Sequence, residues 1–126
     1  MFKDLWFGLL WLGLLGCATS ARPPVLLAAA GPIYPEHARL QQIEGFVTLA
    51  YDLTVSGNVV NVRVLDSVPA GVFDTSAVNA VRDWRFMPMQ HNGQSIPATN
   101  QRSTLTFKLA DDQKDSAKQN RNHKVR

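Results

Sequence analysis

The chain has 126 residues, one cysteine and a formal net charge of +3, from 13 Lys and Arg against 10 Asp and Glu. That length suits one domain, and a single cysteine excludes a disulfide within the chain. The weak positive charge argues against nucleic-acid binding, because the arginines are scattered and do not alternate with aromatic residues on one expected face.

The N-terminus predicts a secretory signal peptide over residues 1–16. Lys3 supplies a short positive start, and an uncharged apolar run over residues 5–15 follows it, as in a signal-peptide hydrophobic region. A membrane-spanning helix needs roughly 20 apolar residues, about twice the length of this run. An uncleaved membrane anchor is the alternative interpretation.

The run ends in Leu14-Leu15-Gly16-Cys17, which resembles the lipobox of bacterial lipoproteins. In that family the cysteine is acylated and becomes the first mature residue, so the resemblance implies lipidation of Cys17. An acyl chain anchors a soluble domain to a membrane without spanning it. Because Ala18 rather than an aspartate follows the cysteine, the resemblance implies the outer membrane, with an inner-membrane anchor as the alternative. A free cysteine that happens to end an apolar run is the simpler interpretation.

Composition divides the rest of the chain into three parts. Residues 17–30 contain Pro23, Pro24 and many small side chains, which predicts a short linker, lipidated at its start. Residues 111–126 contain no aromatic residue and one large aliphatic residue, too little apolar surface to offset the entropy of ordering, so we expect a disordered polar tail. The folded domain is expected over residues 31–110.

The domain is expected to open with a short helix over about residues 35–42. Pro35 fits the first turn of a helix, and the acidic Glu36 suits its positive end. Gly45 is expected to end the helix before the first strand.

A strictly alternating stretch follows and predicts a half-buried strand. The turn residues Ser56-Gly57-Asn58, with a glycine free to adopt positive φ, connect it to a second alternating strand. The two strands should form a hairpin. The side chains expected to face the core are Val47, Leu49, Tyr51, Leu53 and Val55 on the first strand, and Val60, Val62 and Val64 on the second.

A second helix is expected to begin at Asp74, a favoured N-cap residue, and to stop before Pro88. A polar loop then leads to a last alternating strand over residues 103–109. The order helix, strand, strand, helix, strand predicts an α+β domain, with two helices on one face of a three-stranded antiparallel sheet. The apolar stripe of the second helix is Ala77, Ala80, Val81 and Trp84.

The sequence contains no constellation that indicates catalysis. The three histidines lie on separate elements, and Asp52 and Asp66 lie on strands with no pattern that pairs them. A glycine-rich phosphate loop is also missing. We therefore expect no enzyme activity, no cofactor and no metal site.

The last strand is the more informative element. In a three-stranded sheet of this order it pairs on one side only, so its other edge offers unpaired N–H and C=O groups. Proteins use such an edge to capture an extended peptide as an added strand. The alternative is an edge that is only protected, for which Lys108 is suited.

Three segments closely resemble the C-terminal domain of the TonB family: YPEHARLQQIEGFV, SGNVVNVRVLDSVPAGVFD and AVNAVRDWRFMP. The resemblance covers about residues 32–109 and implies a fold of two helices and three strands. It also implies a role in energy-coupled uptake of siderophore- or cobalamin-type nutrients across the Gram-negative outer membrane. The matching positions are Tyr34-Pro35, Ala38, Ile43-Glu44-Gly45, Gly57, Val60, Val62, Ser67, Phe73-Asp74, Ala77, Ala80, Trp84, Phe86 and Pro88.

The resemblance also implies a partner and a binding surface. Family members bind the TonB box, a short extended peptide of TonB-dependent outer-membrane receptors, by strand addition at the last strand. The segment before the first helix, with Ile33 and Tyr34, lies near the receptor in the family, and His37 stands where basic residues are common. The implied strand residues are Ser103, Thr104, Leu105, Thr106, Phe107, Lys108 and Leu109.

A typical family transducer has an N-terminal membrane helix that contacts ExbB and ExbD and a long Pro-rich spacer, and neither pattern occurs in this sequence. A linker over residues 18–30 can reach at most roughly 45 Å at 3.3–3.6 Å per residue. Contact with ExbB and ExbD is therefore doubtful, and binding without direct energy coupling is favoured.

Three hypotheses stay open at this point. The first is a periplasmic TonB-family domain that binds TonB-box-like peptides. The second is an outer-membrane lipoprotein scaffold that uses the same fold without energy coupling and forms a homodimer through the same strand edge. The third is an uncleaved inner-membrane adaptor that borrows the spacer of a partner.

Overall fold

The computed structural model describes residue 16 and residues 20–110. Cys17, nearly all of the expected signal peptide and the expected tail over residues 111–126 lie outside the described residues. Within the described part, no helix has the length and apolar character needed to cross a bilayer. The elements are β1 (Ala21–Arg22), β2 (Val25–Ala28), α1 (Glu36–Leu40), β3 (Gly45–Leu53), β4 (Val59–Val68), α2 (Asp74–Arg82), β5 (Arg85–Met87), β6 (Met89–His91), β7 (Gln94–Ile96) and β8 (Ala98–Phe107).

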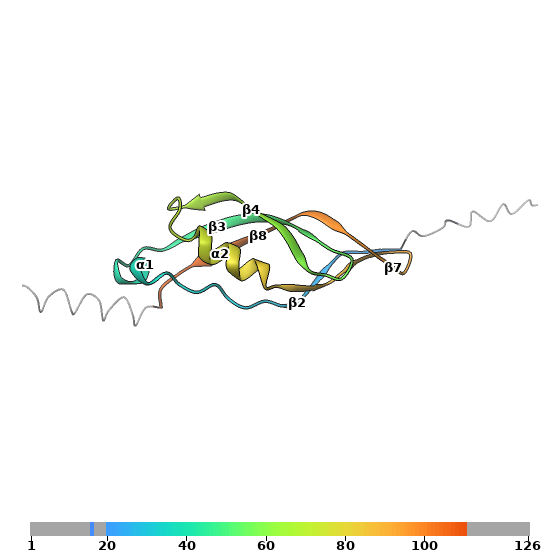
Figure 1. The fold of residues 1–126 in the computed structure, drawn as a ribbon, viewed down its shortest axis with the longest axis horizontal. Helices are drawn as coiled ribbons and strands as arrows, with labels where there is room; N and C mark the ends of the chain where they lie inside the picture. Colours follow the sequence, from blue (N-terminus) through green and yellow to red (C-terminus); the bar gives the residue numbers. More distant parts are fainter. Residues whose placement is uncertain (1–15, 17–19, 111–126) are drawn as a thin grey trace, which may run out of the picture.

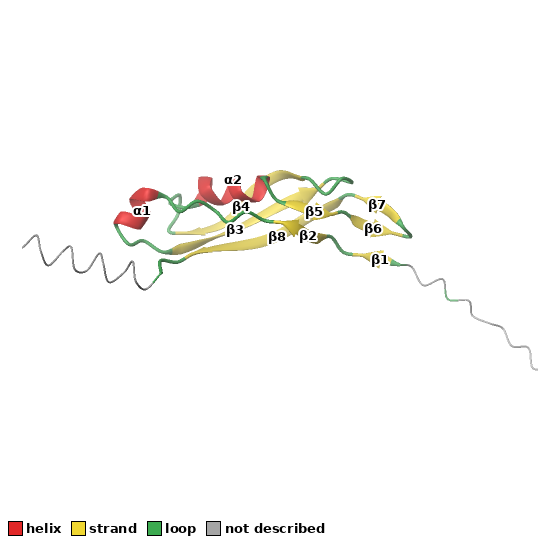
Figure 2. Cartoon of the chain, turned by 90° about the horizontal axis from the view of Figure 1, so that it is seen from below, coloured by secondary structure: helices red, strands yellow, loops and turns green. Residues whose placement is uncertain are grey.

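A three-stranded antiparallel sheet in the order β4-β3-β8 forms the centre of the molecule (Figure 1). Figure 2 shows α1 and α2 on the same side of this sheet, with α1 beyond one end and β1, β6 and β7 at the other end. The expected α+β class is confirmed, although the sheet is accompanied by five short strands that the sequence analysis did not anticipate.

The core lies between β3, β8 and α2. The four predicted inward side chains from Val47 to Leu53 on β3 are buried, as are Ala77, Ala80 and Val81 of α2. An aromatic group closes the end near α1: the rings of Phe73 and Phe107 stack with centroids 4.3 Å apart, and Tyr34 meets Phe73 edge-on at 5.5 Å. Burial of each such side chain contributes about 1.5–3 kcal/mol.

The second strand of the hairpin departs from the predicted alternation. Val60 and Val64, expected to face the core, are 39% and 36% exposed. The pairing of β3 with β4 shifts twice, between Thr48 and Leu49 and between Ala50 and Asp52, and each shift leaves one extra residue on β4. A bulge turns the side chains beyond it toward the other face. Val60 accordingly pairs with Asp52 on the outer face, whereas Val64 still pairs with the buried Leu49 and is exposed on an edge strand.

The β3–β4 turn explains a further correction. Gly57 adopts φ +81°, as expected of the turn glycine, and a Cβ there would lie 1.8 Å from the Phe86 carbonyl oxygen. Val55, predicted to be the last inward residue of the strand, is 52% exposed. β3 ends at Leu53, so Val55 belongs to the turn and has no strand partner to cover it.

The first helix is shorter than expected. α1 spans five residues, with Pro35 in an extended conformation at the N-cap. Gln42, at φ +57°, takes the chain out of the helix, so the prediction that Gly45 ends it was wrong. Gly45 instead opens β3, where a Cβ would lie 1.9 Å from the Val68 carbonyl oxygen. The glycine permits close approach of two strands.

The second helix starts one residue earlier in register than predicted. Phe73 is the N-cap and Asp74 the first helical residue, whose carboxylate accepts a hydrogen bond of 2.6 Å from the Ser67 hydroxyl. The helix ends at Arg82, well before Pro88, as the N–H groups of the next two residues bond three residues back. Trp84 is therefore outside the helix and packs against Tyr51 with centroids 6.3 Å apart.

The segments expected to be a linker and a polar loop both contain strands. β2 pairs with β5, and β1 pairs with β6, which forms a hairpin with β7. Asn92 and Gly93, with φ of +51° and +79°, make the tight turn of that hairpin. β8 consequently spans Ala98 to Phe107 rather than the predicted residues 103–109, and the first strand pairing begins at Ala21.

Candidate functional site

β8 is an edge of the central sheet. Within the described part of the chain it pairs with β3 alone. Leu105 and Phe107 are 6% and 2% exposed, whereas Thr104 and Thr106, which alternate with them, are exposed. The strand thus turns one row of side chains to the core and the other row to the uncovered face of the sheet.

The backbone of β8 is oriented by its end. The N–H of Leu109 donates a hydrogen bond of 2.8 Å to the Glu44 carboxylate, on the β3 side. Successive N–H groups of a strand point to opposite sides, so those of Thr104, Thr106 and Lys108 point to the open side. The register runs from Gly45↔Phe107 to Tyr51↔Gln101 without a shift. Among the described residues, β8 therefore offers a regularly spaced set of unpaired backbone groups.

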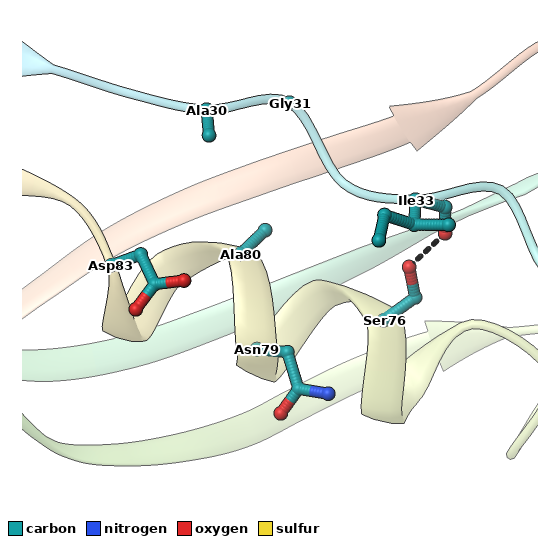
Figure 3. Close-up of a pocket in the computed structure, with 7 residues that line it drawn as sticks. All are labelled: Ala30, Gly31, Ile33, Ser76, Asn79, Ala80 and Asp83. Carbon is teal, nitrogen blue, oxygen red and sulfur yellow. Dashed lines mark hydrogen bonds between the residues drawn. The ribbon is translucent and has the colours of Figure 1, made fainter.

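The residues before α1 lie across α2. Figure 3 shows this segment beside α2. The hydroxyl of Ser76, on α2, donates a hydrogen bond to the carbonyl oxygen of Ile33 in the segment. The indole N–H of Trp84 donates to the Ala30 carbonyl oxygen at 3.2 Å. The Ile33 side chain is 84% exposed. A shallow hollow of about 210 Å³ remains between the segment and the helix. Its lining residues are Ala30, Gly31, Ile33, Ser76, Asn79, Ala80 and Asp83.

The structure brings only some of the predicted site residues together. Tyr34 meets Phe107 edge-on with centroids 5.8 Å apart, and its hydroxyl donates to the Ile43 carbonyl oxygen, so it is a packing residue. His37 is exposed on α1. Ser103 faces inward, with its hydroxyl 3.0 Å from that of Tyr51. Cys17 lies outside the described residues.

The sequence analysis missed a polar cluster that joins the two edge strands. The Asp52 carboxylate, on the central strand, accepts hydrogen bonds from the Asn100 backbone N–H at 2.9 Å and from the Asn61 side-chain amide at 3.1 Å. Arg63 lies 3.7 Å from the same carboxylate and also donates to the Asn100 side chain. Asn61 and Asn100 both adopt φ +53°, which asparagine tolerates better than most residues.

These contacts change the acidity of the carboxyl group. The Asn100 N–H, then the Asn61 amide and the Arg63 guanidinium, hold the pKa of Asp52 below its ordinary value of 3.8. In the sequence, Asn61 and Asn100 are residues that tolerate a left-handed backbone, which was the available signal. No local pattern connects either of them to Asp52. Within the described residues no group of three His, Cys, Asp or Glu could hold a metal ion, and the Asp52 cluster is structural in character.

The geometry can be set beside known proteins. A family model described as the Gram-negative bacterial TonB protein C-terminal matches residues 30–109. Protein TonB of Yersinia enterocolitica is 33% identical over 94 residues, which cover 75% of this chain and 34% of that protein. Protein TonB of Escherichia coli K12 is 40% identical over 68 residues, covering 54% of this chain and 28% of that protein. The chain therefore spans about a third of the length of such relatives.

Solved structures agree in fold. The solution structure of the Pseudomonas aeruginosa TonB C-terminal domain has a TM-score of 0.59 and 30% identity, and the match covers 68% of this chain and 86% of that one. A TonB2 protein from Vibrio anguillarum has a TM-score of 0.53 and 30% identity, covering 87% of this chain and 92% of that one.

Proposed function

This chain belongs to the Gram-negative TonB C-terminal family, and from that premise we propose that it binds TonB-box-like peptides of outer-membrane receptors by strand addition. The binding element is the open edge formed by Ser103 to Phe107 of β8 together with the two residues that follow, Lys108 and Leu109. The chain is a binding protein rather than an enzyme, and it takes part in energy-dependent uptake of siderophore- or cobalamin-type nutrients.

The open, regular edge of β8 carries this proposal. Seven consecutive residue pairs join β8 to β3 without a bulge, and the outward N–H and C=O groups of the same stretch are unpaired within the described residues. A strand added to such an edge gains main-chain hydrogen bonds. Because Leu105 and Phe107 are buried, β8 contributes its backbone and its exposed row of side chains.

The position in the cell is part of the proposal. We place the domain in the periplasm, held in the outer membrane by a lipid on Cys17. Because β1 begins at Ala21, four residue steps separate Cys17 from the first strand, a reach of at most roughly 15 Å. This is well below the 45 Å expected of an unstructured linker, so a receptor in the same membrane is the accessible partner, and ExbB and ExbD stay outside the proposal.

Proline substitution of the open edge tests the binding element. Thr106→Pro removes one outward N–H and leaves a peptide carbonyl without its partner, for which a cost of about 1–3 kcal/mol is expected. TonB-box peptides should bind Thr106→Pro about tenfold or more weakly in a calorimetric titration. Thr106→Ala, which keeps the N–H, should bind like the natural protein, and thermal melts would verify that both variants fold. Equal affinity for all three proteins would exclude β8 as the binding edge.

The short tether also favours a second candidate function. The same edge in an outer-membrane scaffold would pair with a second copy of the chain and would need no long spacer. Sedimentation analysis separates the candidates, since the scaffold predicts a dimer that ignores the peptides, and the receptor-binding protein predicts a monomer that binds them.

A further inference from the structure

The exposed side chains of β8 form one row on the sheet face that α2 does not cover. Across β3 their partners are Ala50, Thr48 and Phe46. The hydroxyl oxygens of Thr48 and Thr104 are 2.9 Å apart, so these two side chains point to the same face of the sheet. In chain order the row is Arg102, Thr104 and Thr106 of β8 and then Lys108, one residue beyond the end of the strand; all four are exposed.

This row has a cation at each end and no acidic residue between them. Within the described part of the chain, the side chains of Arg102 and Lys108 make no hydrogen bond and no ion pair. Arg63, on β4 at the other edge of the sheet, by contrast forms an ion pair with Asp52. Glu44, which immediately precedes β3, accepts a hydrogen bond from the backbone N–H of Leu109. Two positive charges, unpaired among the described residues, therefore flank the free N–H and C=O groups of this edge.

We propose that these two cations select the peptide: the edge prefers an extended segment that carries a carboxylate at the first and seventh of seven residues. The proposal rests on strand addition at β8 and deepens it. Arg102 and Lys108 are six residue steps apart, about 20 Å along an extended backbone, which sets the spacing of the carboxylates. The third and fifth residues would lie opposite Thr104 and Thr106, where β-branched or hydroxyl side chains pack well.

The symmetry of the row has a consequence. Because both ends are cationic, a peptide with acids at both ends satisfies them whether it runs parallel or antiparallel to β8. Opposite charges that face each other across strands contribute up to about fivefold in affinity per pair. The effect should weaken as salt rises, since both cations are exposed.

A matched peptide set tests the proposal with the full-length protein in detergent. Four seven-residue peptides share the central five residues and carry Glu at both ends, Glu at one end, Gln at both ends or Lys at both ends. We expect the doubly acidic peptide to bind about tenfold more tightly than the Gln peptide at low salt, with the Lys peptide weakest. The double variant Arg102→Gln, Lys108→Gln should bind the acidic and Gln peptides equally, and Arg82→Gln, on α2, should keep the preference.

Charge reversal makes the test independent of any loss of stability. A variant with Arg102→Glu and Lys108→Glu should prefer the Lys peptide. If the Gln peptide binds the natural protein as tightly as the acidic one, the charge selection is wrong while strand addition stands. If the double Gln variant instead self-associates and shows unchanged selection, the cations only protect the edge. If no peptide binds, strand addition itself fails and the inference falls with it.

Discussion

The two edges of the central sheet, β4 and β8, differ although both pair with the same strand. β4 carries two bulges against β3, whereas β8 runs through seven pairs without a shift. Bulges twist an edge and interrupt the even spacing of its free N–H and C=O groups, which is one way that proteins avoid unwanted strand pairing. The comparison indicates which edge is closed to an added strand and which is open.

The polar cluster at Asp52 explains how one sheet holds both kinds of edge. Asn61, beside a β4 bulge, and Asn100, at the irregular start of β8, are both bonded to this carboxylate. The irregularity of β8 is thereby confined to its first few residues, before Gln101. Four substitutions test the comparison, from the largest expected effect to the smallest.

Gly45→Ala should destabilise the close approach of β3 to β4. The added Cβ would overlap the Val68 carbonyl oxygen on β4, and overpacking of this kind costs about 1–3 kcal/mol. We expect a loss near the upper end in urea denaturation, because the obstructing atom belongs to the backbone. Gly31→Ala serves as the control, because Gly31 has no positive φ and nothing lies within 4 Å of the new Cβ. Equal losses in both variants would show that the close approach at Gly45 is unimportant.

Asn61→Val should disfavour the β4 bulge. A β-branched residue at φ +53° is strained by about 1–2 kcal/mol, and the side-chain bond to Asp52 is lost as well. Asn61→Gly loses the same bond without the strain, so the difference between the two variants in urea denaturation isolates the left-handed backbone. A valine variant as stable as the glycine variant would mean that the bulge is not held at Asn61.

Asp52→Asn should lower stability at neutral pH by weakening the bonds to Asn61, Asn100 and Arg63. Because the pKa of Asp52 is lower in the folded chain than its ordinary value of 3.8, the folded state binds fewer protons. Its contribution is complete above pH 3.8 and is lost as the pH falls through the lower folded value. Thermal melts of the natural protein and the variant should therefore converge below pH 3.8; a gap of constant size down to pH 2 would contradict this.

Leu65→Lys should have the smallest effect. Leu65 is the extra residue at one β4 bulge and is 47% exposed. A lysine there should therefore leave the fold intact, and it should leave peptide binding intact if the peptide binds at β8. Peptide affinity should stay within about twofold of the natural value, a difference of under about 0.5 kcal/mol. A loss as large as that expected for Thr106→Pro would assign the peptide to β4 and reverse the comparison of the two edges.

The sequence by itself determined the elements whose burial is periodic. The inward row of β3, the turn glycine at Gly57 and the apolar positions of α2 follow from local spacing, and the structure buries or places them as expected. The alternation of Leu105, Phe107 and Leu109 likewise identified the last strand and its buried row. These patterns need only near neighbours, because a strand or helix repeats the same environment every two or every three to four residues.

Only the tertiary structure decided where that repetition fails. The β4 bulge at Asn61 is bonded to Asp52, which also binds Asn100, 48 residues further along the chain. The strand character of residues 25–28 depends on their pairing with β5. The open edge of β8 also depends on what does not pair with it among the described residues. Register and edge exposure are set by partners distant in sequence, and no local period reports them.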